Sequence, residues 1–333
     1  MNKKGGITTI VSFLAVILLT GVLAGTLTVL QSATADAQSD RNEIRQEVEQ
    51  SIRNSGSGDS RNSDSDEDDD NDINEANLRN SDDNEVDQES DQDINCGRGD
   101  SDCSNSAENE ADLQNSDNNE VEQEIEQDDR CLDNSDCENT AENDAELIDS
   151  NNNRVEEETE QNNRCFRDSD CSNTANNDAT LVDTDNSEVE LDTEQKNVCL
   201  LGSTCDNVGT NAAELQNEDG ETVERELRQV NFCVRNSDCS NQGITSEEQP
   251  TNEQKNLCAN SSDCTNMGTN NNNICAHGST CDNSGTGTRI VSLAADCSNS
   301  GSGTTVVCQG SRTLTFEGDE IDSSQLVSGM YRR

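Results

Sequence analysis

The sequence predicts an all-β fold, a disulfide-stapled β-solenoid or β-arcade of about 34-residue repeats, with an N-terminal hydrophobic helix and partly disordered flanks. Three observations predict the repeats. Ten residue types recur at a step of 34 between Cys131 and Gln229, acidic and non-acidic residues alternate within each repeat, and a cysteine pair marks each boundary. A fixed period of this kind is typical of stacked units that bury a core only against their neighbours.

The first 37 residues predict export. Lys3 and Lys4 precede a largely apolar run at residues 7–30, and small residues follow up to Ala37. As a helix, 24 such residues would cover about 36 Å, which is enough to span a bilayer. A cleaved signal peptide, residues 1–37, and an uncleaved N-terminal membrane anchor therefore both remain open. A third interpretation is a pilin-like leader, because Lys3-Lys4-Gly5-Gly6 resembles the processing site of archaeal pilin-like proteins.

Residues 38–73 are interpreted as an acidic low-complexity linker. Part of this stretch superficially matches a calcium-binding loop, but Asp69 stands where such a loop needs glycine for its sharp turn. A solvated acidic loop is the favoured interpretation. The alternative is a weak calcium site, with calcium as the one cofactor that the sequence suggests, at Asp64, Asp66, Asp68, Asp70 and Glu75.

Within residues 74–239, each repeat is expected to form strand, turn, strand and cysteine loop. Residues 105–113 place Asn, Ala and Leu at alternate positions with acids between them, and residues 121–127 alternate again after a turn. A period of two is that of a strand with one face buried. The inward set combines Asn, Ala and Leu from the first strand with Val and Gln from the second. Its members are Asn109, Ala111, Leu113, Val121, Asn143, Ala145, Leu147, Val155, Gln161, Asn177, Ala179, Leu181, Val189, Gln195, Asn211, Ala213, Leu215, Val223 and Gln229.

An asparagine also follows each second cysteine at a distance of two residues, as Asn139 follows Cys137. We expect this asparagine in a turn, where its side chain tolerates the left-handed conformation. Asn143 is expected instead inside a strand, in a column of stacked amides.

The sixteen cysteines predict disulfides, because an even number in an exported chain is typical of a disulfide framework. Most pairs have five residues between them, and an extended segment of that length would hold the two Cα atoms roughly 20 Å apart, so the loop must fold back. Local pairs are favoured, with links between adjacent repeats and zinc binding as alternatives. The residues are Cys96, Cys103, Cys131, Cys137, Cys165, Cys171, Cys199, Cys205, Cys233, Cys239, Cys258, Cys264, Cys275, Cys281, Cys297 and Cys308.

The repeat pattern resembles the curlin repeats of extracellular amyloid fibres. The resemblance covers about residues 74–229 and is carried by Asn109, Ala111, Leu113, Val121, Gln123 and Gln127 with their later copies. It implies strand–turn–strand units with inward amides and small apolar residues. The units here are longer, are fastened by cysteines and carry acidic outer faces. After Cys239 the sequence predicts degenerate, shortened repeats over residues 240–288 and a capping segment over residues 289–333.

Composition restricts the function. A net charge of −50 argues against nucleic acid and anionic membrane surfaces as partners. One histidine and no nucleophile set or phosphate-binding loop argue against an enzyme. The sequence predicts a non-enzymatic structural or adhesive repeat protein of the cell surface or of a fibre, which self-associates or joins a surface matrix and touches membrane only through residues 7–30. A polyanionic calcium-binding matrix protein is one alternative. An intrinsically disordered acidic secreted protein is another, because apolar residues are few, but the constant register of the repeats favours order.

Overall fold

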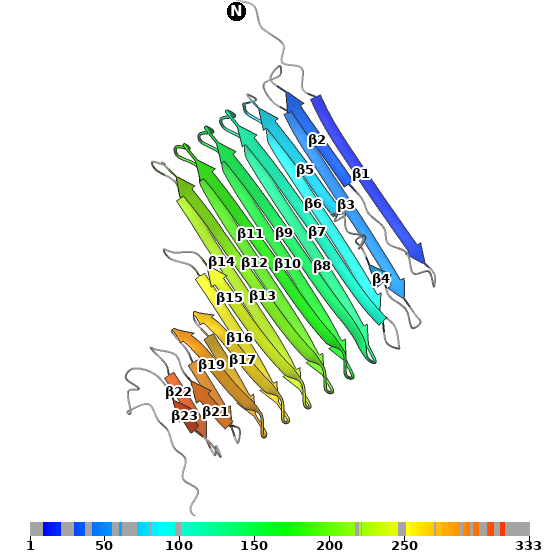
Figure 1. Ribbon diagram of the computed structural model, residues 1–333, viewed down its shortest axis with the longest axis vertical. Helices are drawn as coiled ribbons and strands as arrows, with labels where there is room; N and C mark the ends of the chain where they lie inside the picture. Colours follow the sequence, from blue (N-terminus) through cyan, green and yellow to red (C-terminus); the bar gives the residue numbers. More distant parts are fainter. Residues whose placement is uncertain are drawn as a thin grey trace, which may run out of the picture.

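The computed structural model describes residues 9–20, 30–36, 42–54, 60–61, 72–79, 82–96, 101–216, 220, 222–245, 251–269, 271–286, 289–293, 296–299, 305–309 and 314–316. It is a parallel β-solenoid, and each turn of about 34 residues contributes one strand to each of two facing sheets (Figure 1). The predicted all-β solenoid of about 34-residue repeats is therefore confirmed.

Among the described residues, the first sheet has 11 strands, which pair in chain order. They are β1 (Thr9–Thr20), β3 (Asn42–Asn54), β6 (Glu85–Cys96), β8 (Glu120–Leu132), β10 (Arg154–Phe166), β12 (Glu188–Leu200), β14 (Thr222–Val234), β16 (Thr251–Ala259), β18 (Asn271–Ala276), β20 (Arg289–Leu293) and β22 (Thr305–Gln309).

The second sheet has 12 strands in the described part of the chain. Eleven of them pair in chain order, namely β2 (Leu30–Asp36), β5 (Asp72–Arg79), β7 (Ser101–Gln114), β9 (Ser135–Ile148), β11 (Asp170–Val182), β13 (Thr204–Gln216), β15 (Asp238–Thr245), β17 (Asp263–Thr269), β19 (Thr280–Thr286), β21 (Asp296–Asn299) and β23 (Leu314–Phe316). The short strand β4 (Ser60–Arg61) pairs with β7 outside this order.

The register between neighbouring strands places each residue beside its copy in the next repeat. Val155 pairs with Val189, and Cys165 pairs with Cys199. The step between β6 and β8 is 35 residues, as in the pair Gln92 and Gln127. The additional residue lies in the first cysteine loop, which separates its cysteines by seven positions where the later loops have six. An insertion in the loop therefore leaves the alignment of the strands unchanged.

In the strands whose side chains the structure describes, alternate residues point into the space between the sheets. In β8 the side chains of Val121, Gln123, Ile125 and Gln127 are buried, while the glutamates between them are exposed. The apolar core packs Ala145 and Leu147 from one sheet against Val155 from the other. The alternation of acidic and non-acidic residues is thus the alternation between the outside and the inside of the rod.

Three expected core residues are less buried than the others. Ala213 and Val223 are half-buried, and Leu215 is 38% exposed. They lie where the solenoid narrows, since in the described residues β15 pairs with β13 only up to Asn211 and β16 pairs with β14 only from Glu226. Beyond this step the strands shorten toward the C-terminus (Figure 1).

The turns use left-handed backbone conformations, in most cases at Asn or Asp. Asn115 and Asn118 have φ of 50° and 59°, and Asp133 and Asn134 have 58° and 63°. Asn and Asp adopt this region more readily than other non-glycine residues because their short side chains bond locally. The turns also stack, because the backbone N–H of Asn115 donates to the Ile148 carbonyl of the next turn at 3.0 Å.

The N-terminal apolar run differs from the expectation. Residues Thr9–Thr20 form strand β1, parallel to β3, and not a hydrophobic helix. Two physical reasons favour a strand: the run contains the β-branched residues Ile10, Val11, Val16 and Ile17, and the edge of an existing sheet offers backbone partners. In the part of the chain that the structure describes, no helix is long and apolar enough to cross a membrane. At the other end, β20 to β23 continue both sheets within residues 289–316, where a cap is expected.

The alternation of buried and exposed positions can be tested at two adjacent residues. Leu147 is fully buried, and its neighbour Glu146 is exposed. Leu147→Ala should lower the free energy of unfolding by about 2–5 kcal/mol, through lost burial and a residual cavity. Glu146→Ala should change it by no more than about 0.5 kcal/mol, because it removes only an outward charge. Denaturant unfolding followed by circular dichroism measures both, and equal losses would contradict this placement of the two side chains.

Candidate functional site

Three sets of side chains run along the rod and are the candidates for its function. They are a column of disulfides at the cysteine loops, columns of amides in the interior, and columns of carboxylates on the outer faces. Each set recurs in every full repeat because the register is constant. The candidate site is therefore periodic.

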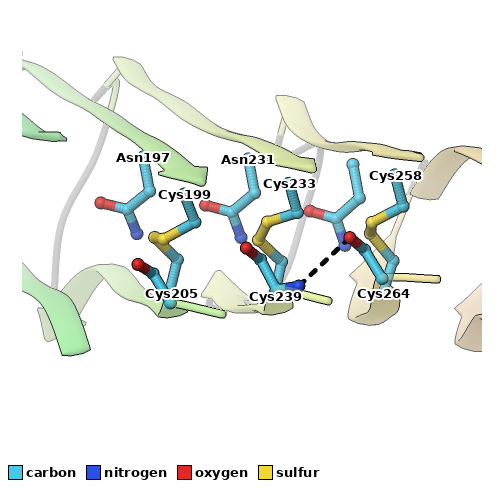
Figure 2. The surroundings of a disulfide bond; sticks show 12 residues. Asn197, Cys199, Cys205, Asn231, Cys233, Cys239, Cys258 and Cys264 are labelled. Carbon is cyan, nitrogen blue, oxygen red and sulfur yellow. Dashed lines mark hydrogen bonds between the residues drawn. A yellow bond between two sulfur atoms is a disulfide. The ribbon is translucent and has the colours of Figure 1, made fainter. Parts of the chain in front are cut away.

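Each disulfide joins the end of one strand to the start of the next across a tight loop. The loop reverses the chain at two residues of positive φ, such as Asp133 and Asn134, and brings the Cα atoms to 6.2–6.5 Å. Figure 2 shows three such bonds in successive turns. The pairs are Cys96–Cys103, Cys131–Cys137, Cys165–Cys171, Cys199–Cys205, Cys233–Cys239, Cys258–Cys264 and Cys275–Cys281.

All seven bonds are local, and among the described residues no disulfide links adjacent turns. The cysteines are at most 4% exposed and form a cluster of their own with Ile94. Sulfurs of successive turns lie close, since those of Cys131, Cys165 and Cys171 are within 4.8 Å of one another. Zinc binds thiolates, and here each of these sulfurs is bonded to another sulfur. The column therefore acts as a covalent closure.

The last two cysteines occupy different positions in the rod. The backbone register places Cys297 of β21 beside Cys281, and Cys308 of β22 beside Ser292. The two residues thus belong to successive turns and opposite sheets, and their side chains lie outside the described part of the structure. The proposed calcium ligands Asp64, Asp66, Asp68 and Asp70 also lie outside the described residues, whereas Glu75 is in β5.

The interior amides form hydrogen-bonded columns along the rod. Gln161 Nε2 donates to Gln127 Oε1 at 2.8 Å, and Gln195 Nε2 donates to Gln161 Oε1 at 2.9 Å. Asn143 Nδ2 donates to Asn177 Oδ1 at 3.2 Å. Gln161 Nε2 also donates to the Thr174 carbonyl of the opposite sheet at 2.8 Å. An amide both donates and accepts, so it can bond its own copy on each side and still connect the two sheets.

The expectation for Asn139 is wrong. It is fully buried within β9 and does not lie in a turn. Its Nδ2 donates to Asn173 Oδ1 in the next turn and to Asn163 Oδ1 in the facing strand, both at 3.1 Å. Asn163 and Asn197 belong to a second column, which was not predicted from the sequence. In the sequence, this column corresponds to the position two residues before the first cysteine of each pair. That position holds Asn in later repeats but Ile94 and Asp129 in the first ones.

The outer faces carry carboxylates that lie beside their own copies. Glu124 stands between Glu89 and Glu158 in register, and Asp192 stands between Glu158 and Glu226. Partial burial, followed by the repulsion of Glu158 and Glu89, raises the pKa of Glu124 to about 6. Burial first and then the charges of Glu226 and Glu158 raise the pKa of Asp192 to about 6.

Few cations offset these charges. Arg154 contacts Glu156 at 2.6 Å, Glu120 at 3.5 Å and Glu190 at 3.6 Å, so it bridges three neighbouring turns. Arg228 contacts Glu194 at 3.1 Å. All these side chains are at least 30% exposed, and solvent screens them. The arginines therefore relieve the repulsion only locally.

The amide columns predict a large effect of Gln161→Leu. The substitution leaves Gln127 Oε1 and the Thr174 carbonyl without the Gln161 donor, at about 1–3 kcal/mol for each group left unsatisfied. The matched control is Asn162→Leu, because Asn162 is half-buried and its amide bonds only the neighbouring Glu160 at 2.9 Å. Chemical denaturation should show a loss for Gln161→Leu alone, and a comparable loss in the control would refute the importance of the columns.

The outer columns predict that the rod gains stability as the pH falls from 7 toward 5. The raised pKa values mean that the folded chain binds more protons than the unfolded chain between about pH 4 and 6. Stability is therefore highest in acid and is lost as the pH rises through this window. The slope should decrease in 1 M NaCl, where the Debye length is about 3 Å. Thermal unfolding measured across this pH range, in low salt and in 1 M NaCl, gives the two slopes of stability against pH. Identical slopes would mean that like-charge repulsion contributes nothing.

Comparison with protein-family models, with curated proteins and with solved structures finds no match.

Proposed function

We propose that this chain is a non-enzymatic structural protein that works outside the cell, at the cell surface or in a fibre. The observation that carries the proposal is the constant register of the solenoid. Successive turns present outward residues of mostly polar or acidic type at the same height, and the turns from Cys96 to Cys281 each have their own disulfide. Such an object has one long repetitive surface, which suits a load-bearing or spacing element.

The disulfide column supports the extracellular part of this proposal. Seven disulfides in one chain are typical of proteins that mature in an oxidising compartment. Closing a short loop stabilises by about 2 kcal/mol in the chain-entropy model. Because the loops recur along the rod, local opening is opposed at every turn and not only at the ends.

The periodicity of the acids argues against catalysis. General acid–base chemistry needs a pair of groups in one asymmetric pocket, where their environments differ. The outer acids recur from turn to turn, and one hollow of about 430 Å³, at the step of the solenoid, is open and lined by acids such as Glu190, Asp192 and Glu224. His277 lies on an exposed loop at φ 57°. These features favour a structural role.

A second candidate function is cation binding along the outer faces, by the carboxylate columns. Glu110, Asp144 and Asp178 lie in consecutive turns and in register. Stacked strands lie about 4.8 Å apart, which lets a divalent cation bridge neighbouring carboxylates with oxygen ligands. Under this hypothesis calcium would be part of the folded rod.

A thermal unfolding experiment separates the two candidates. The structural proposal predicts that the oxidised chain keeps its β signal and its Tm in excess chelator at 0.15 M NaCl, because the disulfides and amide columns need no ion. The chelator-free sample at equal ionic strength is the control. Calcium at constant ionic strength should raise the Tm by no more than a few degrees.

Two outcomes would overturn the structural proposal. Loss of the β signal in chelator would assign the fold to bound cations and favour the second candidate. Recovery of the native chain from the cell interior with reduced thiols, and not from the surface or fibre fraction in oxidised form, would exclude an extracellular role.

A further inference from the structure

Two interior positions hold acids directly beside an amide of the same column. Glu157 of β10 stands beside Gln123, and Asp129 of β8 stands beside Asn163. Glu157 is 0% exposed and Asp129 is 3% exposed. A buried carboxylate without a partner is costly when ionised, so these residues need an explanation.

Glu157 lies in a place that requires a hydrogen-bond donor. Gln123 Nε2 donates to Gln88 Oε1 at 3.0 Å, but among the described residues Gln123 Oε1 has no hydrogen-bond partner, and neither carboxylate oxygen of Glu157 has one. In the neighbouring column each glutamine donates to the one before it, as Gln161 does to Gln127. An ionised carboxylate only accepts, whereas a protonated one has an O–H that can donate to Gln123 Oε1.

Asp129 repeats the same situation in the asparagine column. Its Oδ1 accepts a bond from Asn105 Nδ2 at 2.6 Å, while its Oδ2 has no hydrogen-bond partner in the part of the chain that the structure describes. One turn further, Asn163 Nδ2 donates to the Ser172 carbonyl at 3.0 Å and to Asn173 Oδ1 at 2.7 Å. The register pairs Glu138 with Ser172 and Asn139 with Asn173. Glu138 and Asn139 are therefore the acceptors for Asp129 that correspond to the two acceptors of Asn163. A proton on Oδ2 would supply the missing donor there.

The surrounding charges act against ionisation at both positions. Burial, and then the carboxylates of Asp144 and Asp178 on the facing sheet, raise the pKa of Glu157 well above its usual range. Burial is also the largest cause at Asp129, where Asp128 and Asp93 raise the pKa further and the Asn105 bond lowers it. The neighbouring charges that shift these two pKa values are therefore all negative.

We propose that Glu157 and Asp129 are held protonated inside the rod, and that their ionisation in alkaline solution destabilises the two adjacent turns that carry them. The folded chain keeps these protons at a pH where the unfolded chain has released them, so stability is present in acid and is lost as the pH rises. Between the pKa of the unfolded chain and that of the folded chain, each group changes the folding equilibrium constant by up to about tenfold per pH unit. This pH-sensitive segment does not depend on the proposed role of the rod outside the cell.

The test compares the parent chain with Glu157→Gln and Asp129→Asn, which place permanent donors at these positions. Unfolding is measured from pH 4 to 9 in 1 M NaCl, which screens the outer carboxylates. The amide variants should match the parent near pH 4 and exceed its folding equilibrium constant by at least about tenfold at pH 8. The control is Glu160→Gln, which removes an outward carboxylate from the same strand as Glu157 and, with surface charges screened in 1 M NaCl, should not reproduce the tenfold gain at pH 8.

Several results would overturn the proposal. Parallel pH profiles for the parent and both amide variants would show that the acids are not protonated in the fold. A Glu157→Gln chain that is less stable at pH 8, with a parent that responds to exchange of sodium for potassium, would assign the unpartnered oxygens to a bound cation. Glu157→Leu is a second variant, because Leu191 occupies the same column one turn further. It must also lose the pH dependence that Glu157 contributes.

Discussion

The parallel in-register stack is the constraint on which the rest of the structure depends. Each side chain in the middle of the rod lies beside the corresponding side chain of the preceding and following turns. A residue type is therefore suitable only if it tolerates its own copy at about 4.8 Å. Leu147 and Val155 satisfy this by packing, and Gln161 by donating on one side and accepting on the other. Carboxylates satisfy it least well, and they are abundant only where water can reach them.

The disulfides and the left-handed turns solve a second problem, which is how to reverse the chain without disturbing the alternation of faces. Asp133 and Asn134 adopt positive φ and allow the reversal, and the Cys131–Cys137 bond fixes it covalently. The loops then stack through backbone hydrogen bonds, such as the one in which the backbone N–H of Asp133 donates to the Phe166 carbonyl at 3.0 Å. The interior columns and the loop columns consequently stabilise the same alignment.

Much of the fold could be predicted from the sequence because period two and period 34 are both local properties of residue type. The inward position of Leu147 and the outward position of Glu146 follow directly from parity. The role of Asn139 did not follow, since an asparagine near a loop suits a turn and a strand interior alike, and only the facing Asn163 decides between them. The exposure of Leu215 depends on where β15 and β16 stop. The helix expected near the N-terminus was wrong because hydropathy alone does not distinguish a buried strand from a helix.

The additional residue in the loop between Cys96 and Cys103 has a consequence for how such a protein changes length. The loop accommodates the insertion while Gln92 still aligns with Gln127. A single residue inserted within a strand would instead exchange its inner and outer faces. Duplication or deletion of a whole unit keeps the strands aligned and keeps their inner and outer faces. Each unit gained adds about 4.8 Å to the rod. The length of the molecule is thus a quantity that evolution can alter in discrete steps without designing a new interior.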